Sequence, residues 1–357
     1  MTVLWVNLIL VSVCSFFSRY FAVQTSALGS YVRVRPNGLL IVGAVLSLIL
    51  ISGLRNSIGD TYYYMHAYSM HEFTWDFVKS QKDMGFGVFQ MLLKKYSSDP
   101  QVLVFTTALI TNVLIIVTLY KHSRMIELSI YVYITSGLYL VSMNGIRQML
   151  AASIAFAATY FLFRRQAFYY ILVVIIASTI HESALILIPA YFLSGYRAWS
   201  KSTIYLLGAA VLFAVGYNQI SSFLFAAIQD SQYSHYENFS EGGANIIRVG
   251  VQAVPLIIAY LGRDKLRLIN PYSDYIVNMS LMGFVFMIIS THNWIFARSA
   301  IYFSLYQLLL ISWIILLFKK KEQRLVYFAL LICYFAFYYY ESVISLDVIY
   351  RSNFFSL

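Results

Sequence analysis

Residues 101–120 read QVLVFTTALITNVLIIVTLY, an uncharged and mostly apolar run. One helix crosses the hydrocarbon core of a bilayer with about 20 such residues. The rest of the 357-residue chain has the same character, because 60% of its residues are hydrophobic and only 11% are charged. A soluble domain carries about 25% charged residues. This composition excludes a soluble globular enzyme and predicts an all-α, polytopic transmembrane protein.

Similar apolar runs occupy the whole chain, and they predict about twelve helices in a single transmembrane domain over residues 1–357. The runs lie near residues 3–22, 38–54, 101–120, 126–142, 146–163, 168–180, 183–194, 203–228, 246–262, 272–291, 297–318 and 324–345. The sixth and seventh runs are short, and we predict that these two helices meet at His181 and Glu182.

The basic residues predict how the chain lies in the membrane. The 25 Lys and Arg residues outnumber the 15 Asp and Glu residues and give a net charge of +10. They form short clusters in alternate loops, a pattern that fits the positive-inside rule and not a nucleic-acid-binding surface. The rule predicts that Arg165 and Lys320 face the cytoplasm. It also predicts that residues 55–100 and 229–247 form loops outside the cell.

The first of these outer loops contains a helical pattern. Apolar residues recur at helical spacing beside two lysines: Phe86, Phe89, Leu92, Leu93 and Tyr96, next to Lys94 and Lys95. This arrangement is typical of a helix that lies in the membrane interface. We therefore expect interfacial helices and membrane-lipid contacts in this loop.

Ionisable residues near membrane depth are costly and usually face a cavity. Four segments carry them: GLRNSIGDTYYY with Arg55 and Asp60, NGIRQ with Arg147, STIHESA with His181 and Glu182, and NWIFARSAIY with Arg298. The predicted topology places all of them at the outer ends of helices, which points to one extracytoplasmic pocket. Each also has a structural alternative: helix-end anchors for Arg55 and Arg298, a solvated turn for Arg147, a helix cap for Asp60, and a polar pair for His181 with Glu182.

Such a pocket suits a lipid diphosphate. Guanidinium groups offer planar, two-pronged donors to phosphate oxygens, so Arg55, Arg147 and Arg298 are the predicted diphosphate ligands. No metal-binding motif is present, and we expect no cofactor. An acceptor hydroxyl needs a base, for which His181, Asp60 and Glu182 are the candidates.

The same segments resemble the EpsG family, the Wzy-like polymerases of bacterial exopolysaccharide. The resemblance is carried by GLRNSIGDTYYYMHAY from residue 53, NGIRQMLAASIAF from residue 144 and IHESALILIPAYF from residue 180. It covers residues 50–195 most clearly. Within the first motif Tyr64 belongs to the matching pattern, and we expect it to contact sugar.

The resemblance implies that repeat units on a polyprenyl diphosphate carrier are polymerised at the outer face of a bacterial plasma membrane, in a pathway that builds a biofilm matrix. It also implies a fold like the GT-C glycosyltransferases, although the acidic outer loop here follows the second helix rather than the first. Other exopolysaccharide assembly proteins are possible partners.

Two other functions remain open from the residues alone. A flippase or exporter of lipid-linked glycans also needs arginines that face a cavity, although it needs charge along its whole path. A membrane acyltransferase that modifies the polysaccharide would use a histidine at the membrane boundary as its base.

Overall fold

The protein is described by a computed structural model that covers residues 1–25, 33–215 and 243–355. These residues form two compact units. The first contains Met1–Ile188 and Ile311–Leu357, and the second contains Pro189–Leu310. The predicted loop at 229–247 lies mostly outside the described residues, and the single domain over residues 1–357 stays a prediction.

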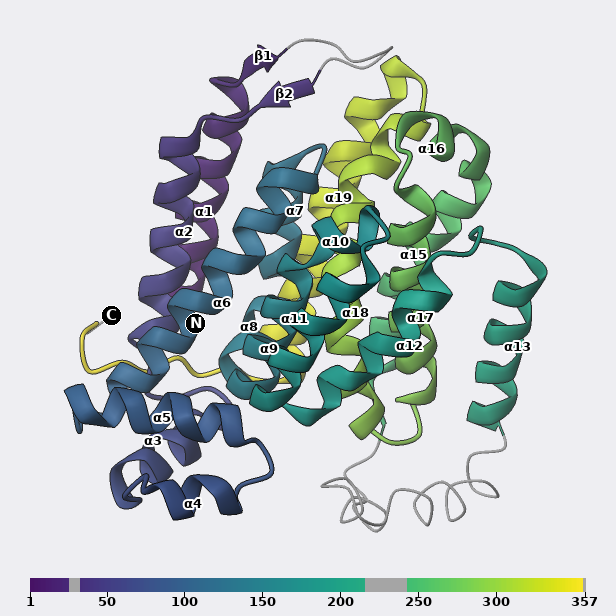
Figure 1. Cartoon of the computed structure of the whole chain (residues 1–357). Helices are drawn as coiled ribbons and strands as arrows, with labels where there is room; N and C mark the ends of the chain where they lie inside the picture. Colours follow the sequence, from purple (N-terminus) through teal and green to yellow (C-terminus); the bar gives the residue numbers. More distant parts are fainter. Residues whose placement is uncertain (26–32, 216–242, 356–357) are drawn as a thin grey trace. The chain divides into compact units, whose positions relative to one another are not determined.

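In the first unit, the α-helices named below pack side by side in their sequence order (Figure 1). Helix α1 (Thr2–Tyr20) packs on α2 (Gly38–Gly53), α2 on α6 (Gln101–His122), and α6 on α9 (Ile146–Ala157). Helix α9 then packs on α11 (Ala167–Ile180). A two-stranded antiparallel ribbon, β1 (Val23–Thr25) and β2 (Arg33–Arg35), lies between α1 and α2 in the sequence.

The remaining helices of this unit are shorter or bent. Helices α7 (Ile126–Thr135) and α8 (Leu138–Asn144) bend by 55° at their junction, and α10 (Thr159–Phe163) follows α9. Helix α19 (Lys320–Tyr339) packs on α7 and continues into the short η4 (Tyr340–Ser345). The short η3 (Ile315–Leu317) precedes α19.

Three short helices lie together at one end of the first unit: α3 (Thr61–Met70), α4 (Trp75–Ser80) and α5 (Met84–Tyr96) (Figure 1). Their apolar side chains share one core with the ends of α6 and α9, made of Tyr68, Phe73, Val78, Phe86, Leu103, Ile146 and Leu150. The helix expected from the spacing of apolar residues near residue 90 is therefore confirmed as α5. Its position in a membrane interface stays a prediction.

The second unit is also helical among the residues described. It contains α13 (Lys201–Val215), α15 (Ile246–Leu261), α16 (Arg263–Ile269) and α17 (Ser273–Ile289). Helix α17 packs against α13 and α15. Helices α12 (Leu187–Ser194) and α18 (Ile295–Ile314) contain the points where the chain passes between the units.

Among the described residues, helices lie in the predicted apolar runs, although the run at 126–142 forms two helices, α7 and α8, and residues 216–228 of the run at 203–228 lie outside the described residues. Fewer of these helices have the length of a membrane span. Among the described residues, four helices are long and apolar enough to cross a membrane, or up to six if each bent pair is one span. The chain is thus an all-α membrane protein, and the number of spans remains a prediction. The break at His181 is confirmed, because α11 ends at Ile180 and the 3₁₀ turn η1 (Glu182–Ile186) follows.

Candidate functional site

A buried carboxylate, Asp83, joins the segments that the sequence singled out. Its Oδ2 accepts from Nη1 of Arg147 at 2.9 Å and from Nδ1 of His181 at 3.2 Å. Its Oδ1 accepts from the backbone N–H of Glu182 at 3.1 Å. The side chain of Asp83 is only 3% exposed. A buried charge is tolerated only when it is paired and hydrogen-bonded, and these three donors meet that requirement.

Local backbone geometry places Asp83 where it can reach these partners. The residue sits at the N-cap of α5, where an aspartate ordinarily accepts from its own helix. Here the side chain makes no such bond. Gly85, two residues on, lies so close to α11 that a Cβ would be 2.2 Å from Oγ1 of Thr179. The missing side chain at Gly85 therefore lets α5 approach the end of α11 and brings Asp83 to His181.

Arg147 lies at the start of α9, and two of its three guanidinium nitrogens are hydrogen-bonded. Its Nε donates to the hydroxyl of Tyr64 at 3.2 Å, and its guanidinium lies 5.7 Å from the Tyr64 ring centre and 5.9 Å from that of Phe86. The side chain is nevertheless 37% exposed. No hydrogen bond joins Nη2 to any described residue. The Nη2 amino group can therefore donate to a ligand.

His181 sits at the break between α11 and η1, with an extended backbone. Its side chain is 7% exposed. Because Nδ1 donates to Asp83, the neutral ring keeps its free lone pair on Nε2. The side chain of the adjacent Glu182 is exposed, and only the backbone of this residue contributes to the cluster.

The electrostatics of the cluster favour an ionised Asp83. Burial would raise the pKa of Asp83, but the hydrogen bond and charge of His181, the charge of Arg147 and the Glu182 N–H together lower it below its usual value. Asp83 is therefore an anion at neutral pH, and Arg147 balances its charge.

Asp60 lies beside the cluster, and its carboxylate accepts no hydrogen bond from a described residue. It occupies the N-cap of α3 and makes no side-chain cap bond, so it does not act as the helix cap that the sequence allowed. Its backbone N–H donates to Oδ1 of Asn144 at 2.9 Å. Gly59 makes this approach possible, since its φ is +53° and a Cβ there would lie 2.0 Å from the same Asn144 oxygen. The carboxylate of Asp60 also acts electrostatically on Arg147.

Arg55 has a different environment from Arg147. It is 1% exposed. Its guanidinium donates to Oγ1 of Thr61 at 3.0 Å and to the carbonyls of Ser52 and Met143. Burial lowers its pKa to about 10, which leaves it charged at neutral pH. These contacts tie three backbone segments together, so they argue against the prediction that Arg55 binds diphosphate.

The other predicted diphosphate ligand, Arg298, lies in the second unit on α18, where its guanidinium is 4.6 Å from the ring centre of Trp294. Its part in the site stays a prediction. Within the described ranges, no three His, Cys, Asp or Glu side chains are close enough to hold a metal ion.

Of the predicted residues, the structure thus brings Arg147, His181 and Tyr64 together, with Asp60 nearby. Asp83, which joins them, was missed by the sequence reasoning. The sequence did contain one signal for Asp83. This aspartate directly precedes the apolar residues at helical spacing that form α5, and aspartate is a preferred residue at the start of a helix.

A comparison with models of known protein families shows which family the chain belongs to. The model of the EpsG family matches residues 38–355, nearly the whole chain. The chain belongs to the EpsG family. The resemblance seen in the sequence is confirmed, and it extends well beyond residues 50–195. No curated protein and no solved structure matches this EpsG family member, so its likeness to GT-C enzymes stays a prediction.

Proposed function

We propose that this EpsG family protein polymerises oligosaccharide repeat units, carried on a polyprenyl diphosphate, into exopolysaccharide of a bacterial biofilm matrix. Membership of the family supports a function related to exopolysaccharide polymerisation. The observation that carries the proposal is the carboxylate of Asp83, which orients a candidate base, His181, and a candidate diphosphate ligand, Arg147, at once.

In the proposed reaction, a hydroxyl of one lipid-linked repeat attacks the anomeric carbon of the growing chain. A new C–O bond forms, the bond between the anomeric carbon and the diphosphate oxygen breaks, and the diphosphate leaves with the electron pair. The hydroxyl proton passes to Nε2 of His181, whose other ring nitrogen is held by Asp83. A base positioned by a second group in this way is the arrangement that activates hydroxyl nucleophiles in many enzymes.

Arg147 would bind the leaving diphosphate. Two of its nitrogens are fixed by Asp83 and Tyr64, so the Nη2 amino group is already oriented before substrate arrives. Donors that are held in place stabilise the charge that develops on a leaving group without a cost of reorganisation. Tyr64 then serves to position Arg147, in addition to any contact with sugar.

Asp60 is the second candidate base in this mechanism. Its carboxylate carries no hydrogen bond from the described residues, in contrast to that of Asp83. A direct comparison of His181→Gln and Asp60→Asn in purified protein separates the two. The variant of the true base should lose at least about 100-fold in rate, and the other should retain most of it.

We also propose that α3–α5 and the cluster face the outside of the plasma membrane, as the positive-inside rule predicts. Cysteine labelling of intact cells with a membrane-impermeant reagent tests this orientation. A cysteine in place of the exposed Asp76, in α4, should be labelled, and Lys320→Cys should not.

A strain that lacks the protein tests the function. Loss of a polymerase leaves single repeats on their lipid carrier at the outer face. Loss of a flippase traps them inside, and loss of an acyltransferase leaves polymer of normal length without acyl groups. Either of the last two outcomes would replace the proposed function.

A further inference from the structure

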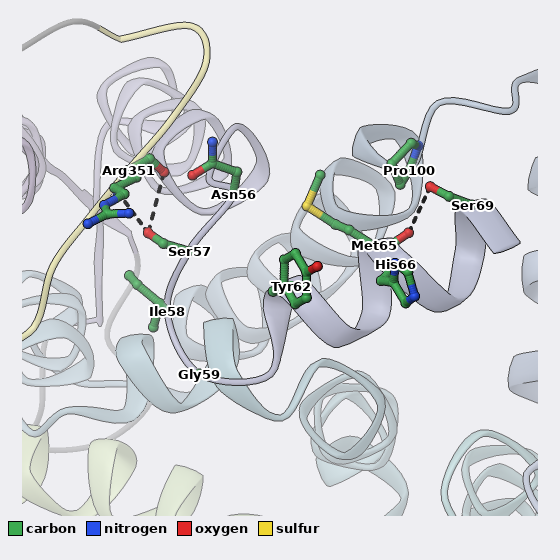
Figure 2. A pocket seen from close by; sticks show the side chains of 10 residues that line it. All are labelled: Asn56, Ser57, Ile58, Gly59, Tyr62, Met65, His66, Ser69, Pro100 and Arg351. Carbon is green, nitrogen blue, oxygen red and sulfur yellow. Dashed lines mark hydrogen bonds between the residues drawn. The ribbon is translucent and has the colours of Figure 1, made fainter.

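A cavity of about 660 Å³ lies in the first unit, apart from the Asp83 cluster (Figure 2). It is bounded by residues 56–59, by one face of α3, by Pro100 and by Arg351 from the C-terminal segment. Its size is typical of pockets that bind small ligands. The ion-pair residues Asp83, Arg147 and His181 do not line it.

Helix α3 separates the cavity from the cluster. Four residues of α3 line the cavity, Tyr62, Met65, His66 and Ser69, and their spacing places them on one face of the helix. Tyr64 faces away from them, because it contacts Arg147. Asp60 lies at the N-terminus of the same helix. A chain of sugar rings passing over this end of α3 would therefore reach from the cavity toward the cluster.

Two aromatic side chains of α3, Tyr62 and His66, line the cavity. The rings of Tyr62 and His66 are nearly parallel, at 10°, with their centres 5.9 Å apart. Tyr62 is 65% exposed, although it is a large aromatic residue. Exposed rings that line a cavity are suited to stacking on the apolar faces of sugars, with the polar edge of the ring left to bind hydroxyls.

The opposite wall carries a positive charge held by the C-terminal segment. The carbonyl of Arg351 accepts from Asn56 N–H at 3.0 Å, and its own N–H donates to Oγ of Ser57 at 2.7 Å. Tyr350 and Ser352, on either side, also bond the backbone of residues 51–54. Arg351 is thus fixed through its backbone, while its exposed guanidinium has no hydrogen bond or ion pair to a described residue. Neither Asp nor Glu occurs among the described residues that line the cavity.

We propose that this cavity binds a sugar residue that carries a carboxylate or another anionic group. The sugar ring stacks on Tyr62, and its anionic group pairs with the guanidinium of Arg351. The proposal rests on the proposed function, since the sugar would belong to the repeat unit that is polymerised. It adds that the repeat is acidic and that the C-terminal segment contributes to its recognition.

A binding experiment tests this without turnover. Full-length protein in detergent micelles is applied to an array of defined oligosaccharides, acidic and neutral, and the dissociation constant of the tightest acidic ligand is measured by calorimetry. Arg351→Gln should weaken that binding by about 10–100-fold, and Tyr62→Ala by up to about tenfold. Arg351→Gln should leave the binding of a neutral oligosaccharide of equal length unchanged.

Two matched variants serve as controls. Tyr96→Ala removes a tyrosine of α5 that is 88% exposed and does not line the cavity. Arg165→Gln removes an exposed arginine elsewhere in the first unit. Neither should alter the dissociation constant, and the melting temperatures of all variants confirm that they fold.

The proposal is overturned if no acidic glycan binds in a manner that depends on both Tyr62 and Arg351, or if neutral glycans bind equally well. This failure is distinct from failure of the proposed function. Asp83→Asn should lower the rate of polymer synthesis by about 100-fold or more and still bind the acidic glycan. Glycan binding with full polymer synthesis in Asp83→Asn would keep the site and remove the proposed mechanism.

Discussion

Replacing Asp83 with asparagine changes one oxygen to an amino group and leaves the shape of the side chain intact. Three donors converge on the wild-type carboxylate, two on Oδ2 and one on Oδ1. An amide has only one acceptor oxygen, so in either orientation its NH₂ group faces at least one of these donors. The change therefore either leaves the Glu182 N–H without its acceptor or turns the amide NH₂ toward Arg147 and His181, where Nδ1 must become an acceptor and the ring proton moves to Nε2.

The structure gives a magnitude for each consequence. An unpaired buried donor costs about 1–3 kcal/mol of folding free energy. The Arg147 pair contributes little of this loss, because that side chain is 37% exposed and water screens its charge. A loss of about 2 kcal/mol leaves most of the protein folded when the total stability is roughly 5–15 kcal/mol. The rate should fall much further, by about 100-fold to 10,000-fold, because the base loses its orientation.

The assay compares the rate of polymer formation from lipid-linked repeats by purified protein with the amount of folded protein. The matched control is Asp76→Asn, which makes the same chemical change at an exposed residue of α4. We expect that control to have the wild-type rate. The reasoning is refuted if Asp83→Asn retains a rate within about threefold of wild type, which corresponds to less than 1 kcal/mol in the transition state.

Three further results are expected. Arg147→Lys should keep the melting temperature and lower the polymerisation rate by about 10–100-fold. Arg55→Lys should lower the free energy of unfolding by about 1–3 kcal/mol in a thermal melt, because Arg55, unlike Arg147, donates to buried carbonyls. Gly85→Ala should lower the free energy of unfolding by about 1–3 kcal/mol and should also lower the polymerisation rate. The added Cβ would push α5 away from Thr179. The pKa of Asp83 is lowered in the folded protein, so its carboxylate adds to the free energy of unfolding only while it is ionised. The difference in unfolding free energy between wild type and Asp83→Asn should therefore be at its full value above about pH 5 and shrink below about pH 4, where Asp83 becomes protonated.

Much of the fold is predictable from the sequence because hydropathy and helical periodicity are local. A run of 20 apolar residues predicts α6 with bounds that differ by two residues at one end. The spacing of Phe86, Phe89 and Leu93 predicts α5. The break at His181 follows from two short runs on either side of a polar pair. The number of spans is less predictable, because several apolar helices are shorter than a bilayer requires.

The contents of the site depend on contacts that no local pattern contains. Arg55 and Arg147 look alike in sequence, since each lies in a polar segment at the end of an apolar run. What separates them is the set of acceptors that the fold supplies: a carbonyl 88 residues away, at Met143, for the buried Arg55, and a carboxylate 64 residues away, at Asp83, for the half-exposed Arg147. A buried arginine that donates to backbone carbonyls stabilises the fold, whereas one that keeps a nitrogen without a protein acceptor has donors for a ligand. For that reason the Arg147→Lys and Arg55→Lys pair measures the division of roles between binding and folding, and equal effects of the two substitutions on rate and on stability would contradict it.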